Sequence, residues 1–242
     1  MAHQAGTNGV LTSVLKPAIL CLHGGGTNTG IFNIQTIRIQ RALASDFDFV
    51  FLDAPIESGP GPDVLPVFEG CGPYLRWTID RASTEMPEVT KTMIDRLAGE
   101  QRAKDGRGFV GILGFSQGAK LATGLLLEHQ LGKGIDWGDG LRFGVICNGT
   151  SPPLTYHLSQ EERSVKLDIP TLHLVGLLDP WRDESRRLRS VHCQHEQAVL
   201  LEFDVGHRLP FLPQDNVKIC AEILRMYHES SARNKLALGA SP

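Results

Sequence analysis

The sequence predicts a three-layer α/β fold, in which a mostly parallel sheet of about six strands lies between two layers of helices. Short, almost continuously apolar segments recur along the chain, as expected of strands that are buried on both faces. Each of these segments is followed by a longer helical pattern, and this alternation favours parallel strands joined by right-handed connections. The chain has 242 residues, enough for one domain with a sizeable core.

The strands are expected at Ala18–Leu22, Phe47–Leu52, Phe109–Leu113, Phe143–Cys147, Thr171–Val175 and Val199–Phe203. The helices are expected at about Ile31–Leu43, Glu85–Ala103, Gln117–His129, Trp181–His192 and Asp215–His228. We expect a single domain over residues 1–242, with flexible tails at about 1–15 and 231–242, where small and polar residues predominate.

Composition excludes several classes of protein. With 24 Lys and Arg against 27 Asp and Glu, the formal net charge is −3, whereas a nucleic-acid-binding protein usually has a basic excess. No apolar run approaches the roughly 18 residues of a membrane span, and the first residues lack the pattern of a secretory signal. The five cysteines are scattered and include no C-x-x-C pair, which favours reduced thiols. We therefore expect a soluble cytoplasmic protein.

A candidate nucleophile follows the third predicted strand, where the chain reads Gly114-Phe115-Ser116-Gln117-Gly118-Ala119. A G-x-S-x-G sequence between a strand and a helix is typical of a sharp turn that lifts the serine hydroxyl above the sheet. The backbone N–H of Gln117 then opens the helix and is available to a developing oxyanion. The alternative is a serine that only caps the helix.

A glycine-rich turn, His23-Gly24-Gly25-Gly26-Thr27, follows the first predicted strand. Such a turn can bring a second N–H to the same oxyanion, and we expect that of Gly25. A dinucleotide-binding turn is the competing interpretation, but G-x-G-x-x-G would need a third glycine at Thr29. We expect His23 to anchor the loop by hydrogen bonds.

The acid and the base are expected after the fifth and sixth predicted strands. Asp179 and His207 follow these strands, so both should lie beside Ser116 at the carboxyl edge of the sheet. Asp183 and Asp204 are the competing acids. His192 and His195 are three residues apart, but two ligands without a convincing third are weak evidence for a metal. We predict neither a metal nor another cofactor.

A long irregular segment, Ala54–Ser83, interrupts the alternation and is rich in proline and glycine at its start. Connections in α/β domains usually span two to six residues, and longer ordered ones are often lids or binding loops. Its apolar residues Val67, Phe68, Tyr74 and Trp77 are expected to line an acyl pocket, or alternatively to form a small core under the loop. A surface excursion without a role is the remaining alternative.

Several of these motifs together resemble the fungal family of small serine hydrolases with an α/β-hydrolase fold. The resemblance covers about residues 17–227 and rests on Leu22–Asn28, Ile31-Phe32, Gln35, Gly114–Ala119, Asp179-Pro180 and Gly206-His207. Within the long segment, Gly59–Pro62, Leu65-Pro66 and Phe68–Tyr74 resemble the polyketide-releasing thioesterases of that family. The resemblance implies Ser116, Asp179 and His207 as nucleophile, acid and base. It also implies a substrate carried on the phosphopantetheine arm of a polyketide synthase carrier domain.

An arginine cluster, Arg182, Arg186, Arg187 and Arg189, opens the helix after Asp179, and Arg208 follows His207. Arginines at this edge can bind an acidic carrier domain or its phosphate, whereas the alternative is a solvated helix face with an Asp183–Arg187 ion pair. We therefore expect an acyl thioesterase that acts on a polyketide or other long chain. A carboxylesterase acting on short or medium oxygen esters is the alternative, and a non-catalytic binding protein on the same fold is a remote one.

Overall fold

A computed structural model describes the backbone of residues 15–239 and the side chains up to residue 232. The expected N-terminal tail lies almost entirely outside these residues. In chain order the elements are β1 (Ala18–Leu22), α1 (Thr29–Ala42), β2 (Asp48–Leu52), β3 (Ile56–Ser58), β4 (Tyr74–Arg76), α2 (Glu88–Asp105), β5 (Phe109–Phe115), α3 (Gln117–Gln130), β6 (Phe143–Cys147), α4 (Gln160–Arg163), β7 (Thr171–Gly176), α5 (Arg182–His192), the short 3-10 helix η1 (His195–Gln197), β8 (Ala198–Phe203) and α6 (Pro213–Gly239).

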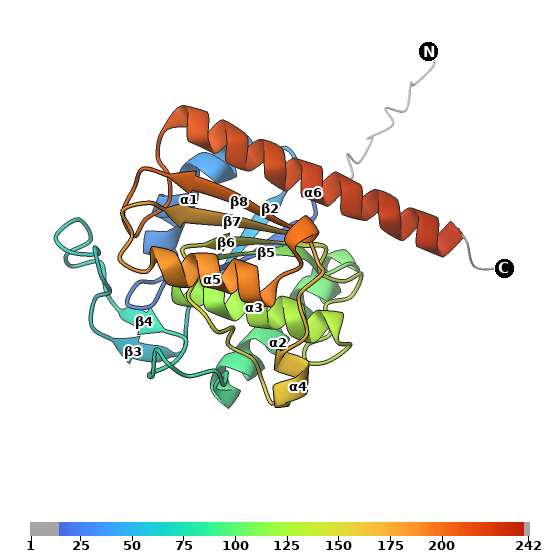
Figure 1. Ribbon diagram of the computed structural model, residues 1–242, viewed down its shortest axis with the longest axis horizontal. Coiled ribbons are helices and arrows are strands. Elements are labelled where there is room, and N and C mark those ends of the chain that lie inside the picture. Colours follow the sequence, from blue (N-terminus) through green and yellow to red (C-terminus); the bar gives the residue numbers. More distant parts are fainter. Residues whose placement is uncertain (1–14, 240–242) are drawn as a thin grey trace, which may run out of the picture.

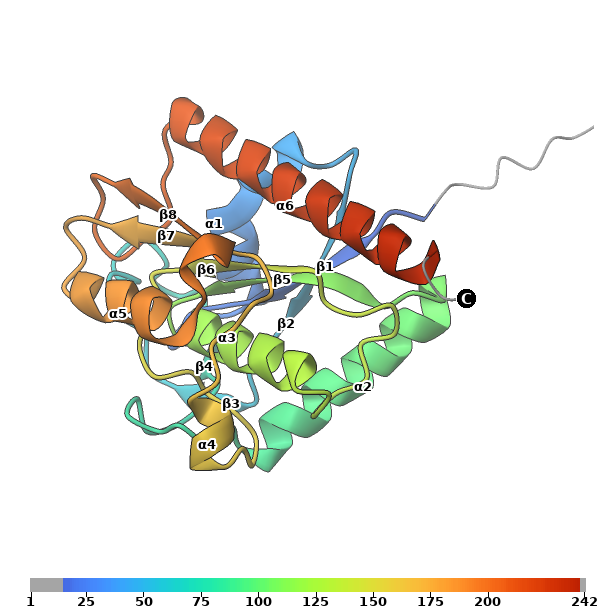
Figure 2. The ribbon, with the colours of Figure 1, turned by 45° about the vertical axis from the view of Figure 1, so that its right-hand side comes forward.

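The main sheet has six parallel strands in the order β2-β1-β5-β6-β7-β8, which confirms the predicted fold class. Helices α1 and α6 cover one face, and α2, α3 and α5 cover the other (Figures 1 and 2). Alternate residues of β1 enter two separate cores: Leu20 and Leu22 pack with α2 and α3, whereas Ile19 and Cys21 pack with α1 and α6. Burial on both faces explains why the strands read as continuous apolar runs.

The segment between β2 and α2 contains the largest departure from the expected pattern. Strands β3 and β4 form a separate antiparallel pair beside the main sheet (Figure 1). The glycine-rich turn holds this segment through backbone bonds, from Gly26 N–H to the Leu75 carbonyl at 2.7 Å and from Gly61 N–H to the Gly26 carbonyl at 2.9 Å. The segment is therefore ordered against the carboxyl edge of the sheet.

The last helix is also longer than expected. The apolar stripe predicts a helix that ends near His228, but α6 continues to Gly239 and occupies most of the expected C-terminal tail. Its buried residues Ile219, Ile223 and Met226 pack on the sheet, and the polar turns that follow extend the same helix. The helix therefore extends beyond the apolar stripe that predicts it.

Candidate active site

Ser116 lies in the sharp turn between β5 and α3, at the carboxyl edge of the sheet. Its backbone has φ 54° and ψ −115°, a left-handed conformation that is costly for a residue with a side chain. The flanking glycines make the turn possible: a Cβ on Gly118 would overlap the Leu22 carbonyl, and one on Gly114 would overlap that of Gly118. The Ser116 side chain forms no helix-capping bond, so the capping alternative does not hold.

Ser116, His207 and Asp179 form one hydrogen-bonded chain. The Ser116 Oγ lies 2.9 Å from His207 Nε2, and His207 Nδ1 lies 2.7 Å from Asp179 Oδ2. Both Asp179 and His207 are 5% exposed. Because the carboxylate can only accept, it fixes the imidazole proton on Nδ1 and leaves Nε2 free to accept the serine proton. This arrangement suits nucleophilic attack by the serine oxygen.

The competing acids do not contact His207. The Asp183 side chain is 82% exposed and pairs with Arg182. Asp204 is exposed and directly follows the last residue of β8. Asp179 is instead held by its own loop, since its Oδ1 accepts the N–H of Trp181 at 2.8 Å. The His207 ring also packs between aromatic side chains, 5.0 Å from Phe115 and 4.8 Å from Trp181 between ring centroids.

The backbone N–H groups of Gly25 and Gln117 belong to two turns that pack against each other beside Ser116. A Cβ on Gly24 would lie 3.5 Å from the Ser116 Cβ, and one on Gly25 would lie 3.1 Å from the Gln117 side chain, so the turn packs directly on the elbow. Within the part of the chain that the structure describes, the Gly25 N–H forms no hydrogen bond. The Gln117 N–H is the first of α3 and lacks an intrahelical partner. Both groups are available to an oxyanion.

His23 anchors the glycine-rich turn, in agreement with expectation. The ring is fully buried, its Nε2 accepts the Ala54 N–H at 2.9 Å, and its Nδ1 lies 2.8 Å from the Gly24 carbonyl. Burial lowers the pKa of His23, so the ring stays neutral and can accept at one nitrogen while it donates at the other. Its ring therefore joins the glycine-rich turn to the start of the long segment at Ala54.

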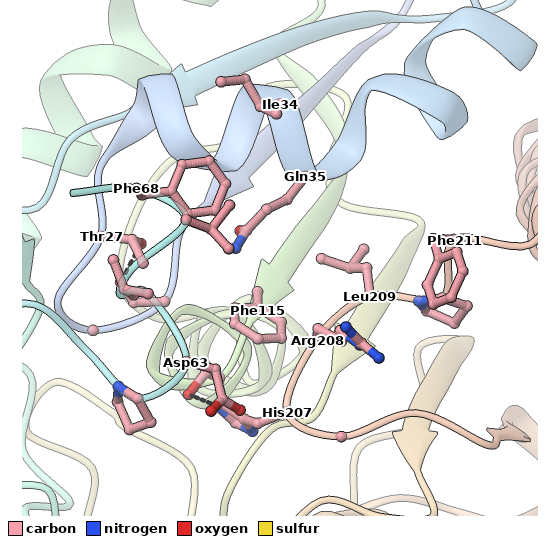
Figure 3. Close-up of a pocket in the computed structure, with 18 of the residues that line it drawn as sticks. Thr27, Ile34, Gln35, Asp63, Phe68, Phe115, His207, Arg208, Leu209 and Phe211 are labelled. Atoms are coloured by element: carbon pink, nitrogen blue, oxygen red, sulfur yellow. Dashed lines mark hydrogen bonds between the residues drawn. The ribbon is translucent and has the colours of Figure 1, made fainter. Parts of the chain in front are cut away.

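A cavity of about 650 Å³ opens over Ser116 and His207 (Figure 3). Three elements build its walls: α1, residues 62–68 of the long segment, and the loop 206–211 that follows β8. The apolar lining comes from Ile34, Ile37, Pro62, Val64, Leu65, Val67, Phe68, Phe115, Leu209, Pro210 and Phe211. Besides Ser116 and His207, the polar side chains that line the cavity are Thr27, Gln35, Arg38, Asp63 and Arg208. Such a cavity can accept a ligand that carries both apolar and polar groups.

Only part of the predicted pocket is found at this cavity. Val67 and Phe68 line it, but Tyr74 and Trp77 do not. Tyr74 instead stabilises the long segment, because its hydroxyl donates to the Phe68 carbonyl at 2.6 Å. Trp77 is fully buried in the main core, and its indole N–H donates to the His23 carbonyl at 2.7 Å. Trp77 therefore belongs to the main core, and neither to the acyl pocket nor to a separate small core under the loop.

The α1 wall and the loop at Leu209 and Phe211 were not predicted. The positions that α1 turns to the cavity, Ile34 and Ile37, are 60% and 36% exposed, and in the sequence they resemble a solvent-facing side of a helix. Two isoleucines on the outer face of an amphipathic helix are the signal that marks this wall.

The arginine cluster is largely engaged within the protein. Arg186 Nε lies 2.7 Å from Glu202 and its Nη1 lies 3.8 Å from Asp183, whereas the Asp183–Arg187 pair of the alternative interpretation does not form. Asp183 pairs with the neighbouring Arg182 instead, at 3.1 Å. Arg187 is exposed and forms no ion pair among the described residues.

The histidines outside the site show no ligand arrangement. His192 ends α5, where its Nε2 lies 3.2 Å from the Ser151 Oγ, and His195 lies in η1. In the described residues, no three His, Cys, Asp or Glu side chains are grouped so that they could hold a metal ion. None of the helices that the structure describes is long and apolar enough to span a membrane.

A serine held by a buried histidine and aspartate, on a strand–turn–helix elbow of a parallel sheet, defines the class of serine hydrolases with the α/β-hydrolase fold. Residues 13–219 match the family model described as "Serine hydrolase (FSH1)", and the chain belongs to this family. The expectation of a hydrolytic enzyme is thereby confirmed.

Curated relatives and solved structures agree with this assignment. The chain is 36% identical to the thioesterase FSL2 of Gibberella zeae, with 86% of this chain and 91% of that protein covered. It is 37% identical to the esterase FUS5 of Gibberella fujikuroi, with 93% and 92% covered. The fold is similar to that of acyl-protein thioesterase 2 from Zea mays, with a TM-score of 0.57, 18% identity, and 89% and 96% of the two chains covered.

Proposed function

We propose that the protein is a thioesterase that releases a polyketide or other long acyl chain from the phosphopantetheine arm of a synthase carrier domain. One observation carries the proposal: the hydrogen-bonded Ser116–His207–Asp179 chain opens into a cavity of about 650 Å³ with extensive apolar walls. The similarity to a thioesterase over most of both chains supports it.

The reaction proceeds through an acyl-serine. The Ser116 oxygen attacks the acyl carbonyl while its proton passes to His207 Nε2, and the N–H groups of Gly25 and Gln117 hold the oxyanion. The C–S bond then breaks, and the leaving thiolate takes the proton from His207. Water repeats the sequence on the acyl-serine, again with His207 as base, and releases a carboxylic acid. Asp179 stabilises the imidazolium in each half-reaction.

A carboxylesterase acting on oxygen esters is the second candidate, and the similarity to an esterase supports it. The same residues serve both reactions, so the leaving group must be varied. We expect kcat/KM for an acyl pantetheine thioester to exceed that for an ethyl ester of the same acyl chain, and this preference to grow with acyl length. Equal or faster turnover of the ester, highest on short chains, would overturn the thioesterase assignment in favour of an esterase.

We further propose that Arg187 is the member of the arginine cluster that contacts an acidic carrier domain, because its guanidinium is exposed and free of ion pairs with described residues. Arg187→Glu should lower kcat/KM for a carrier-bound acyl group severalfold and leave that for the small pantetheine thioester unchanged. Arg96→Glu, on the exposed face of α2, is the control for charge reversal elsewhere on the surface. Equal loss on both substrates, or no loss on either, would contradict the contact.

A further inference from the structure

The α1 wall of the cavity combines apolar and polar side chains at helical spacing. Ile34 and Ile37 are accompanied by Gln35 and Arg38, which lie three residues apart and therefore on one side of the helix. Gln35 points from α1 toward Phe68 on the other wall (Figure 3). The amide is thus carried by a rigid element and presented to the space where the acyl chain would lie.

The Gln35 amide has no hydrogen-bond partner among the described residues. Its Oε1 is fully buried and receives no donor, and its Nε2 forms no bond but is not buried, so that this end faces the cavity. The amide of Gln40, on the same helix, is hydrogen-bonded: its Nε2 donates to Asn33 Oδ1 and to Thr36 Oγ1, both at 2.9 Å. Buried polar groups are normally paired, so the unpaired amide of Gln35 is an exception in this helix.

No side chain of the opposite wall forms a hydrogen bond with Gln35. Leu65, Val67 and Phe68 contribute apolar side chains to that wall, and Leu209 also lines the cavity. An unsubstituted alkyl chain in this space would displace water from the amide and give no hydrogen bond in return. A chain with an oxygen at the right position would accept the Nε2–H and so replace the hydrogen bond lost with the water.

We propose that Gln35 is a specificity-determining residue, which binds an oxo or hydroxyl oxygen carried along the acyl chain. This inference rests on the proposed function, in that the cavity is taken as the acyl site. The preferred substrate is therefore an oxygenated acyl chain with apolar stretches on either side of the oxygen, rather than a plain fatty acyl chain.

The test uses ten-carbon acyl pantetheine thioesters, one unsubstituted and the others with a single oxo group at carbon five, seven or nine. For wild type, at least one oxo substrate should exceed the unsubstituted one in kcat/KM. Gln35→Met keeps the length of the side chain and removes the amide. It should lower this ratio by about threefold to tenfold, the value of one hydrogen bond, through slower turnover of the oxo substrate. Gln40→Met, the same change on the same helix but away from the cavity, should leave the ratio unchanged.

An unchanged ratio in Gln35→Met, or an equal loss on all chains, would overturn the inference. The same acyl chains, presented as ethyl esters, distinguish failure of this inference from failure of the proposed function. Changing the leaving group tests thioester hydrolysis, whereas the oxo group tests the role of Gln35 with either leaving group.

The dissociation constants of the free acids, measured by calorimetry on wild type and Gln35→Met, give the same comparison without turnover. The oxo acid should lose affinity in the variant and the unsubstituted acid should not. Equal affinities in both proteins would contradict the role of Gln35.

Discussion

The side chain of Gln117, the residue that follows the nucleophile, binds Trp77, which lies 40 positions earlier in the chain: its Oε1 accepts the backbone N–H of Trp77 at 2.7 Å. Its amide nitrogen donates to the Thr78 carbonyl at 3.0 Å, so both ends of the side chain are used. The Trp77 indole reaches from there to the His23 carbonyl. The long segment is thus fastened to both loops that supply the proposed oxyanion donors, which explains why Trp77 is buried behind the site instead of lining the cavity.

Gln117→Leu tests this connection. Loss of both side-chain bonds leaves the Trp77 N–H and the Thr78 carbonyl unpaired, and should lower the free energy of unfolding by about 2 kcal/mol. It should also lower kcat by about tenfold, because the elbow and the glycine-rich turn lose a shared support. Denaturant unfolding and steady-state kinetics measure the two effects. An active variant with unchanged stability would show that the segment is held by its backbone contacts alone.

Gly26 should tolerate no side chain, whereas Gly70 should tolerate one. Both residues have a left-handed backbone, with φ of 77° and 75°, but a Cβ on Gly26 would overlap the backbone of Gly61, and nothing lies within 4 Å of one on Gly70. Gly70→Ala should therefore cost about 1 kcal/mol from backbone strain. Gly26→Ala should cost about 2 kcal/mol more from the overlap and should reduce activity. Equal costs in thermal unfolding would contradict the contact between the turn and the segment.

Asp179→Asn tests the assignment of the acid. An amide in place of the carboxylate can bind the wrong tautomer of His207, so kcat should fall by about four orders of magnitude while the fold is retained. Asp183→Asn is the control, because this exposed carboxylate lies in the same loop–helix region and does not contact His207. A comparable loss in both variants, or activity retained in Asp179→Asn, would show that another group orients the histidine.

Glu128 should make stability depend on pH near neutrality. This residue of α3 is 1% exposed; its Oε1 accepts the Tyr156 N–H at 2.6 Å, and its Oε2 has no partner among the described residues. Burial raises the pKa of Glu128 from 4.5 to about 7. The folded state therefore keeps a proton that the unfolded state loses between these values. Consequently, the free energy of unfolding falls as the pH rises through this window, and stays lower above it.

Glu128→Gln keeps an acceptor for Tyr156 and removes the charge. The variant should be more stable than wild type by about 3 kcal/mol at pH 8, and the difference should nearly vanish at pH 4.5. Urea unfolding of both proteins at the two pH values isolates this residue, because every other titrating group is shared. A difference that does not change with pH would show that the carboxyl titrates normally in the folded protein.

The sheet and the proposed catalytic residues could be predicted because each depends on a local pattern. The strands are apolar runs, Ser116 lies between two glycines, and Asp179 and His207 directly follow strands whose ends must meet at one edge. Parallel pairing then brings residues that are far apart in the chain to the same place, so the order of the motifs was sufficient.

The cavity wall formed by residues 62–68 could not be predicted because it depends on the path of a segment without periodicity. Several of the contacts that set this path join backbone atoms, such as Gly61 N–H and the Gly26 carbonyl, and leave no trace in the side-chain pattern. Tyr74 and Trp77 are large aromatic residues of the kind that often line pockets, but here they support the long segment and do not line the cavity. Gln35 lines the cavity because the segment lies opposite α1.

The most direct measurement is the mass of the protein quenched during turnover of a long-chain acyl pantetheine thioester, followed by location of the added mass on a peptide. We expect wild type to carry one acyl group on Ser116, with one thiol released for each acyl group bound. Ser116→Ala should carry none and release thiol at a rate at least about a hundredfold lower. An acyl group on another residue, or sustained thiol release by Ser116→Ala, would contradict the account.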